Sequence, residues 1–187
     1  MTESDQITSH ATEADLAEAL PFVLAAPASG GKVTMLCTRP APNQRAFPDR
    51  LVLTRAEGIP GDRWLTAPWQ RLPDGSPDPE IQVSILPSRV LDLVWRDRES
   101  IVHPGDPIAA DLDMSEANLP PGTLLRAGTA TLRVSGIWND GCVKWKVRCG
   151  TPAWRWVRAV PELRLRGIFC AVEQDGEVAL GDRIVKL

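Results

Sequence analysis

The chain has 187 residues, of which 43% are hydrophobic and 24% charged, and a formal net charge of −3 at pH 7. This length suits one domain with a sizeable core, and the composition is ordinary for a globular protein. No apolar run approaches the roughly 20 residues of a membrane span, and the acidic start lacks the features of a signal peptide. We therefore expect a cytoplasmic protein with no membrane partner, and the acidic balance argues against nucleic acid as a partner.

The first part of the chain stands apart because all of its charged side chains are acidic. A short helix is predicted there, with Thr12 as its N-cap and Asp15 at its third position. Pro21 and the Pro- and Gly-containing stretch after it are expected to end regular structure. We therefore predict an acidic N-terminal extension or linker over residues 1–31 and a single domain over residues 32–187.

Short runs of β-forming residues recur along this domain, separated by turns that contain glycine and proline. The predicted strands are residues 32–38, 49–55, 81–86, 108–114, 123–126, 129–135, 166–173, 177–180 and 183–187. The predicted helices are residues 88–96 and 154–160. Asp175-Gly176 is a hairpin signal that should fold the next strand back on the preceding one. This pattern indicates a mostly β fold, closed into a barrel with a few short peripheral helices.

The four cysteines are spaced in a way that fits neither a zinc knuckle nor a disulfide framework, so free thiols are expected. Cys142 follows a turn, Asn139-Asp140-Gly141, and the stretch from Cys142 to Arg166 inclusive has seven basic residues against one acid, Glu162. Nearby cations lower the pKa of a thiol and favour the reactive thiolate. These residues indicate a small anionic ligand beside a reactive Cys142. A buried structural cysteine beside a solvated basic face is the alternative.

Other side chains near this stretch keep two interpretations open. Cys149 is a competing thiol, whereas the remaining two cysteines, in predicted strands, are expected to pack in the core. Trp138 and Trp145 either stack on a flat ligand or fill the core, and core filling is the commoner fate of tryptophan. His103, which precedes a proline, is predicted to be a turn residue.

Several segments match one family pattern in the right order along the chain. They are Gly58–Arg63, Gln82–Leu86, Leu119–Gly128, Ala130–Val134, Leu165–Val172 and Gly176–Ile184. With Cys142 at the matching place, they resemble the MOSC domain, the C-terminal domain of molybdenum cofactor sulfurases, which also occurs as small stand-alone proteins. The resemblance covers about residues 32–187.

This resemblance implies a MOSC-like β-barrel that binds molybdenum cofactor (molybdopterin) or a related pterin. It also implies chemistry at Cys142, which would carry sulfur or ligate the metal of the cofactor. The cofactor needs cations for its phosphate and polar groups for its pterin edges. The cofactor-binding residues predicted from matching positions and from the basic run are Asp62, Arg63, Asp111, Lys144, Arg166 and Gly167. Asp62 is expected to orient Arg63 or to cap a turn rather than to act on a substrate.

The sequence departs from the family pattern at two places, and this leaves the function open. Trp64 stands where the family often has histidine, and Ala110-Asp111-Leu112 stands where it tends to have Glu-Asn before leucine. One hypothesis is a molybdenum-cofactor-dependent oxidoreductase that reduces N-hydroxylated compounds, or a sulfurtransferase, served by a redox or sulfur-donor protein. Another is a non-catalytic binding module for a small anionic ligand or a protein partner. A third is a molybdenum-independent thiol enzyme.

Overall fold

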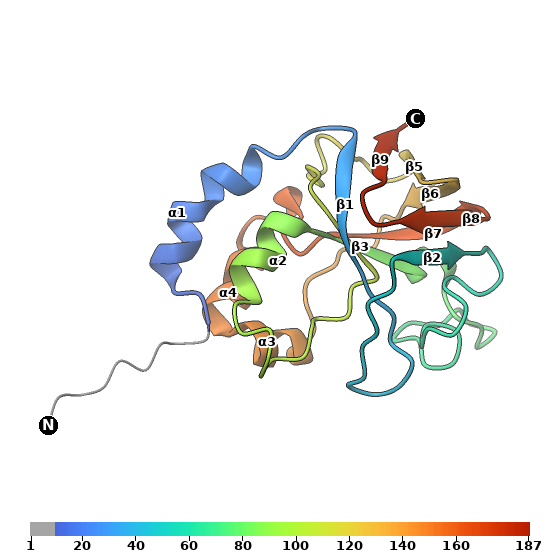
Figure 1. The fold of residues 1–187 in the computed structure, drawn as a ribbon, viewed down its shortest axis with the longest axis horizontal. Coiled ribbons are helices and arrows are strands. Elements are labelled where there is room, and N and C mark those ends of the chain that lie inside the picture. The colour runs from blue at the N-terminus through green and yellow to red at the C-terminus, as the bar shows by residue number, and fades with distance from the viewer. Residues whose placement is uncertain (1–9) are drawn as a thin grey trace, which may run out of the picture.

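The computed structural model describes residues 10–187, and its centre is a closed β-barrel (Figure 1). The strands are β1 (Gly31–Leu36), β2 (Arg50–Leu53), β3 (Val83–Pro87), β4 (Ile108–Ala110), β5 (Leu124–Ala127), β6 (Ala130–Val134), β7 (Ile168–Gln174), β8 (Gly176–Ala179) and β9 (Arg183–Lys186). The barrel order is β1-β4-β3-β7-β6-β5-β9, closed by β9 pairing with β1, and β2 and β8 form a separate two-stranded sheet. The predicted mostly β, barrel-like fold is therefore confirmed.

Strand β3 is buried along its whole length. It pairs in parallel with β4 and antiparallel with β7, and all five of its residues are buried. Val83 and Ile85 belong to the barrel core, whereas Leu86 belongs to a second cluster with Leu91 and Trp95. Burial on both faces explains why this strand is apolar, apart from Ser84, and does not alternate between apolar and polar residues.

The helices gather on one side of the barrel, as Figure 1 shows. They are α1 (Glu13–Leu24), α2 (Ser88–Val94), α3 (Val143–Cys149) and α4 (Thr151–Ala159), with two short 3₁₀ turns at Pro79–Ile81 and Pro161–Leu163. One apolar cluster joins all four, with Leu16, Val90, Trp145 and Val157 among its members. Within residues 10–187 no helix is long and apolar enough to cross a membrane.

Helix α1 begins as its sequence predicts. The Thr12 side chain accepts from the backbone N–H of Asp15, and the Asp15 carboxylate accepts from the backbone N–H of Thr12, which completes a capping box. The sequence predicts that Pro21 ends this helix, but the helix continues to Leu24. Buried Val23 packs the last turn against the other helices, and this tertiary contact outweighs the cost of a proline inside a helix. The division after residue 31 stays a prediction, although α1 packs on the same cluster as the domain helices.

Two other predictions about local structure were wrong. Helix α3 was not expected after the Cys142 turn, and β8 does not pair back on β7. Both edges of β7 are already occupied, by β3 and by β6, so β8 pairs with β2 instead. Asp175 assists this change of direction, because its carboxylate accepts from the Arg55 backbone N–H at 2.8 Å.

Gly167, just before β7, should tolerate no side chain. Its φ is +87°, and a Cβ there would lie 2.1 Å from the Ile85 carbonyl oxygen of β3. Gly75 has the same φ with open space around it, so Gly75→Ala carries only the backbone strain, about 1–3 kcal/mol. Gly167→Ala should lower the free energy of unfolding by at least about 2 kcal/mol more than Gly75→Ala does, because the backbone at Ile85 must move to make room for the new methyl group. Urea unfolding of both variants measures this difference. Equal losses in the two variants would contradict this packing.

Candidate functional site

A divided pocket lies where the loops beside β1, β3 and β7 meet the start of α3. The aromatic half is lined by Trp69, Trp138 and Phe169 with Asp106 and Arg166. The cationic half is lined by Arg39, Arg45, Arg63, Lys144 and Arg148. Their volumes, about 230 and 270 Å³, lie a little below the roughly 300–1,000 Å³ of a typical small-molecule site. Six residues, Cys142 among them, line both, so we treat the halves as one site.

Cys142 is the accessible thiol of this pocket. It is the N-cap of α3, with extended backbone (φ −71°, ψ 170°), and its side chain is exposed. The other three cysteines are buried, and burial raises the pKa of Cys37, Cys149 and Cys170 to about 12. Cys149, the competing thiol, is therefore a packing residue, which leaves Cys142 as the accessible thiol of the pocket.

Aromatic rings give the first half a flat, partly solvated surface. Trp69 packs on Phe169 with ring centroids 5.8 Å apart, and Trp69 is 65% exposed, so much of its ring is free to contact a ligand. Trp138 is 42% exposed on the same half. Trp145, in contrast, is 1% exposed and belongs to the helical cluster, as the core-filling interpretation expects.

Asp106 and Arg166 form a buried ion pair at the base of the aromatic half. Arg166 Nη1 donates to Asp106 Oδ1 at 2.8 Å, and the Ser84 hydroxyl donates to the same oxygen at 2.9 Å. Burial would raise the pKa of Asp106, but the charge and hydrogen bond of Arg166 outweigh it and lower that pKa. Asp106 is therefore a carboxylate at neutral pH. Asp106 Oδ2 and Arg166 Nε remain buried without a partner among the described residues.

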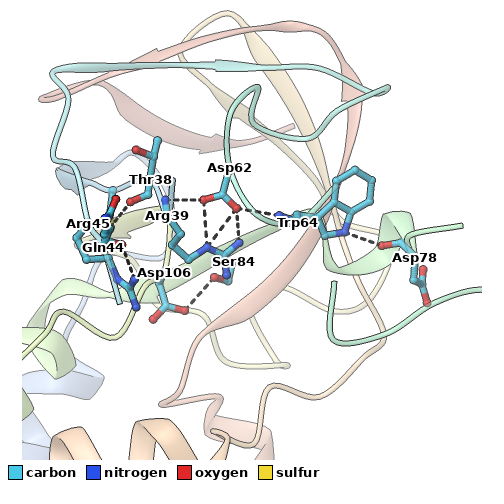
Figure 2. A network of polar contacts seen from close by, with 10 residues as sticks. Thr38, Arg39, Gln44, Arg45, Asp62, Trp64, Asp78, Ser84 and Asp106 are labelled. Atoms are coloured by element: carbon cyan, nitrogen blue, oxygen red, sulfur yellow. Dashed lines mark hydrogen bonds and ion pairs between the residues drawn. The ribbon is translucent and has the colours of Figure 1, made fainter. Parts of the chain in front are cut away.

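The cationic half carries five basic side chains, and no acid lines it among residues 10–187. Arg39 is fixed by Asp62, which accepts from its Nε at 3.1 Å and from its backbone N–H at 2.8 Å. Figure 2 shows the Arg39 guanidinium directed at Asp62, with Ser84 and Asp106 beyond it. Arg63 and Lys144 have no hydrogen bond or ion pair from their side chains to any other described residue. This excess of positive charge favours an anionic ligand.

Arg45 is partly buried and lies close to another cation, Arg148. Burial, followed by the charge of Arg148, lowers the pKa of Arg45. The two guanidinium groups are held in place by oxygen acceptors, namely the His103 carbonyl for Arg45 and the Pro104 carbonyl for Arg148. Bound negative charge would relieve this repulsion.

Residues 94–185 match the family model described as MOSC domain. The chain therefore carries a MOSC domain that includes these residues. Among solved structures, it is similar to the YuaD protein from Bacillus subtilis, with 21% identity, a TM-score of 0.60, and coverage of 82% of this chain and 93% of that one. It is also similar to YiiM from Escherichia coli, with 18% identity, a TM-score of 0.54, and coverage of 83% and 69%. No curated protein sequence matches the chain.

The MOSC fold brings together most of the side chains that the sequence predicts for the site. Cys142 and Arg166 line the aromatic half, and Cys142, Arg63 and Lys144 line the cationic half. Asp62 lies behind the wall, where it holds Arg39 instead of Arg63 and also accepts from the Trp64 backbone N–H at 3.1 Å. Asp62 therefore caps a turn, one of the two roles predicted for it. The arginine that it orients is Arg39, and not Arg63 as predicted.

Besides Asp62, two more of the predicted ligand-binding residues line neither half of the MOSC pocket. Asp111 forms an ion pair with Arg89 at 2.6 Å, and Arg89 also stacks on Phe22 of α1, so Asp111 joins the helical side to the barrel. Gly167 lines neither half, and its role is the close approach to β3 described above. Both are structural residues in this arrangement.

Sequence reasoning missed Arg39, Ser84, Asp106, Trp69 and Phe169, all of which line the MOSC pocket. Arg39 and Asp106 each lie beside a proline in a turn, where a charged side chain normally means only solvent exposure. The available signal was the polar Ser84 inside an otherwise apolar strand, because a buried hydroxyl requires a partner. That partner is Asp106, 22 residues further along the chain.

Thiol titration should report this arrangement of cysteines directly. With an aromatic disulfide reagent at pH 8, the native protein should release about one equivalent rapidly, because the buried thiols are protonated and shielded. Cys142→Ser should abolish the rapid phase, and denatured protein should release four equivalents. A rapid phase that survives in Cys142→Ser would show that another thiol is accessible.

His103 should make the stability of the domain depend on pH. It is 2% exposed, its Nδ1 accepts from the Gly105 backbone N–H at 3.1 Å, and burial lowers its pKa from 6.5 to about 4. The unfolded chain therefore binds more protons between these values, and stability falls as the pH is lowered from about 6.5 to about 4. We expect the free energy of unfolding of His103→Asn to change less with pH across this window than that of the wild type. Identical slopes for the two proteins would contradict the assignment.

Proposed function

We propose that this pocket binds molybdenum cofactor, or a pterin of similar shape and charge, with the Cys142 thiolate as the protein's ligand to the metal. The observation that carries the proposal is the position of the one exposed thiol. Cys142 lies on the boundary between an aromatic half and a cationic half. A ligand with a flat ring, a soft metal and a phosphate would contact all three features.

The donor set around Cys142 supports a metal that arrives with its own ligands. Within residues 10–187 no group of three or more His, Cys, Asp or Glu side chains could hold a metal ion. A free metal ion would therefore lack ligands here, whereas a metal that is already bound by a dithiolene needs few ligands from the protein. Thiolate is a ligand that soft metals prefer. When bound, the cofactor would supply a redox-active metal centre beside this thiol.

The cationic half provides the contacts that a phosphate requires. Arg63 and Lys144 have no other described partner, so a phosphate would not have to displace an existing bond. Arg148 and Arg45 are anchored at its rim by carbonyl oxygens. Charge-assisted hydrogen bonds from arginine to phosphate are among the stronger polar contacts in proteins. These residues bind and orient the phosphate end in this proposal.

The aromatic half suits the flat ring of a pterin. Trp69 and Trp138 present partly exposed rings, and Arg166 is held in a fixed orientation by Asp106. Stacking on tryptophan contributes about 1 kcal/mol beyond the burial of area. These side chains exclude water from one face of the ring and fix its direction relative to Cys142.

The groups that could take part in acid–base chemistry in the described lining of this pocket include two carboxylates, Asp106 and Asp140, and each is paired with an arginine. No histidine lines either half among the described residues, and Trp64 donates its indole N–H to the Asp78 carbonyl at 3.1 Å, away from the ligand space. We therefore propose binding of the cofactor, with sulfur carriage or an oxidoreductase role at Cys142 as its use. The alternative that these observations favour is a non-catalytic module that binds a small anion.

Loading with cofactor tests the proposal. The protein is produced anaerobically in cells that supply molybdenum cofactor, and bound molybdenum and pterin are measured by mass spectrometry and fluorescence. Wild type should carry both in comparable amounts. Cys142→Ala should retain at least about tenfold less molybdenum, because it lacks the soft ligand. Combined Arg63→Gln and Lys144→Gln should reduce pterin and molybdenum together, because the phosphate contacts are lost.

Arg183→Gln is the matched control, since this exposed arginine lies in β9 and contacts the Gly30 carbonyl. It should load like wild type. Equal, near-zero loading of wild type and Cys142→Ala would overturn the proposal. Binding of a phosphorylated pterin without molybdenum, unchanged in Cys142→Ala and weakened by the double variant, would favour the anion-binding module instead.

A further inference from the structure

The outer face of α3 presents an unusual apolar ridge. Val143 and Val147 are 73% and 72% exposed, the highest values among the large hydrophobic side chains described. They are four residues apart, so both point to the same side of the helix. Trp145 and Cys149 occupy the opposite side and are buried. The ridge is therefore the solvent face of a helix whose inner face is already packed.

Positive charge flanks this ridge on both sides. At about 100° per residue, Lys144 lies to one side of Val143 and Lys146 to the other. From Cys142 to Arg158 the chain contains no aspartate or glutamate. The basic groups are therefore not neutralised by their own segment, in a protein whose formal net charge is −3. We call Val143, Lys144, Lys146 and Val147 the docking face.

We propose that the docking face binds the acidic, partly apolar surface of another protein and brings it to the mouth of the Cys142 pocket. Two adjacent exposed β-branched side chains with a cationic border match a partner that has an apolar patch with an acidic border. Lys144 belongs to both the docking face and the pocket wall. A protein seated on the docking face would therefore lie next to the accessible thiol.

A protein partner fits these side chains better than a polyanion does. Nucleic acid is held mainly by contacts to its phosphates, which use cations and leave exposed valines unpaired. The overall acidic charge also repels a long polyanion. A second copy of this chain would bring its own Lys144 and Lys146 against the same cations if the two faces met symmetrically. The proposal does not depend on which ligand the pocket holds.

Site-specific photo-crosslinking identifies the partner. A benzophenone amino acid replaces Val147 in the full chain, in the native host, and replaces Val52 in a control. Val52 is also an exposed valine, at 46%, on the separate β2–β8 sheet. The Val147 position should give a protein adduct that the Val52 position does not give. The captured protein is then purified and titrated against the unmodified chain.

The expected titration has three parts. Val143→Gln with Val147→Gln should weaken binding at least about tenfold, because two buried valines are lost from the interface. Lys146→Glu should weaken binding about fivefold, and raising the salt from about 50 to about 300 mM should weaken wild type similarly. Val52→Gln should bind as wild type does. Thermal unfolding of each variant checks that the fold is retained.

The proposal is overturned by any of several outcomes. These are a nucleic-acid adduct, an adduct with a second copy of the chain, and no adduct beyond the Val52 control. It is also overturned if the captured protein binds the folded valine double variant or Lys146→Glu as tightly as wild type. Cofactor loading of the pocket is measured in a separate experiment. A failure to load cofactor therefore does not change the interpretation of binding at the docking face.

Discussion

The buried carboxylate of Asp106 is the contact on which the pocket depends. It is 3% exposed and receives hydrogen bonds from Ser84 of β3 and from Arg166, just before β7. A buried charge costs several kcal/mol unless it is paired, so these groups stabilise one another only as a set. Removal of Asp106 would leave the Arg166 guanidinium buried and uncompensated, which is strongly destabilising.

Arg166 also helps to hold the turn before the accessible thiol of Cys142. The Asn139 amide donates to the Arg166 carbonyl at 3.3 Å, and the Trp154 indole of α4 donates to the Gly141 carbonyl at 2.8 Å. The turn before Cys142 is therefore held from the barrel on one side and from the helices on the other. The cysteine on this turn is therefore accessible, and the turn that carries it is anchored by hydrogen bonds on both sides.

The barrel could be predicted from the sequence because its signals are local, namely short β-forming runs and Gly or Pro turns. Helix α3 could not, because Val143, Trp145 and Val147 alternate with lysines in the period of a strand. Burial of Trp145 with Cys149, four residues apart, was the helical signal, and only tertiary packing reveals it. The Arg39–Asp62 and Asp106–Arg166 pairs join segments far apart in the chain, and no local pattern encodes such pairs.

Trp64 illustrates how one substitution can change the chemistry of a site while preserving its wall. Its ring is 6% exposed and packs over Gly58, and its indole N–H is bonded to the Asp78 carbonyl. Where the family often has an imidazole, this chain has a rigid apolar surface beside five cations. An apolar wall strengthens the field of neighbouring charges because it excludes water. The Trp64 indole nitrogen donates a hydrogen bond and accepts none, so this part of the wall contributes shape rather than acid–base chemistry.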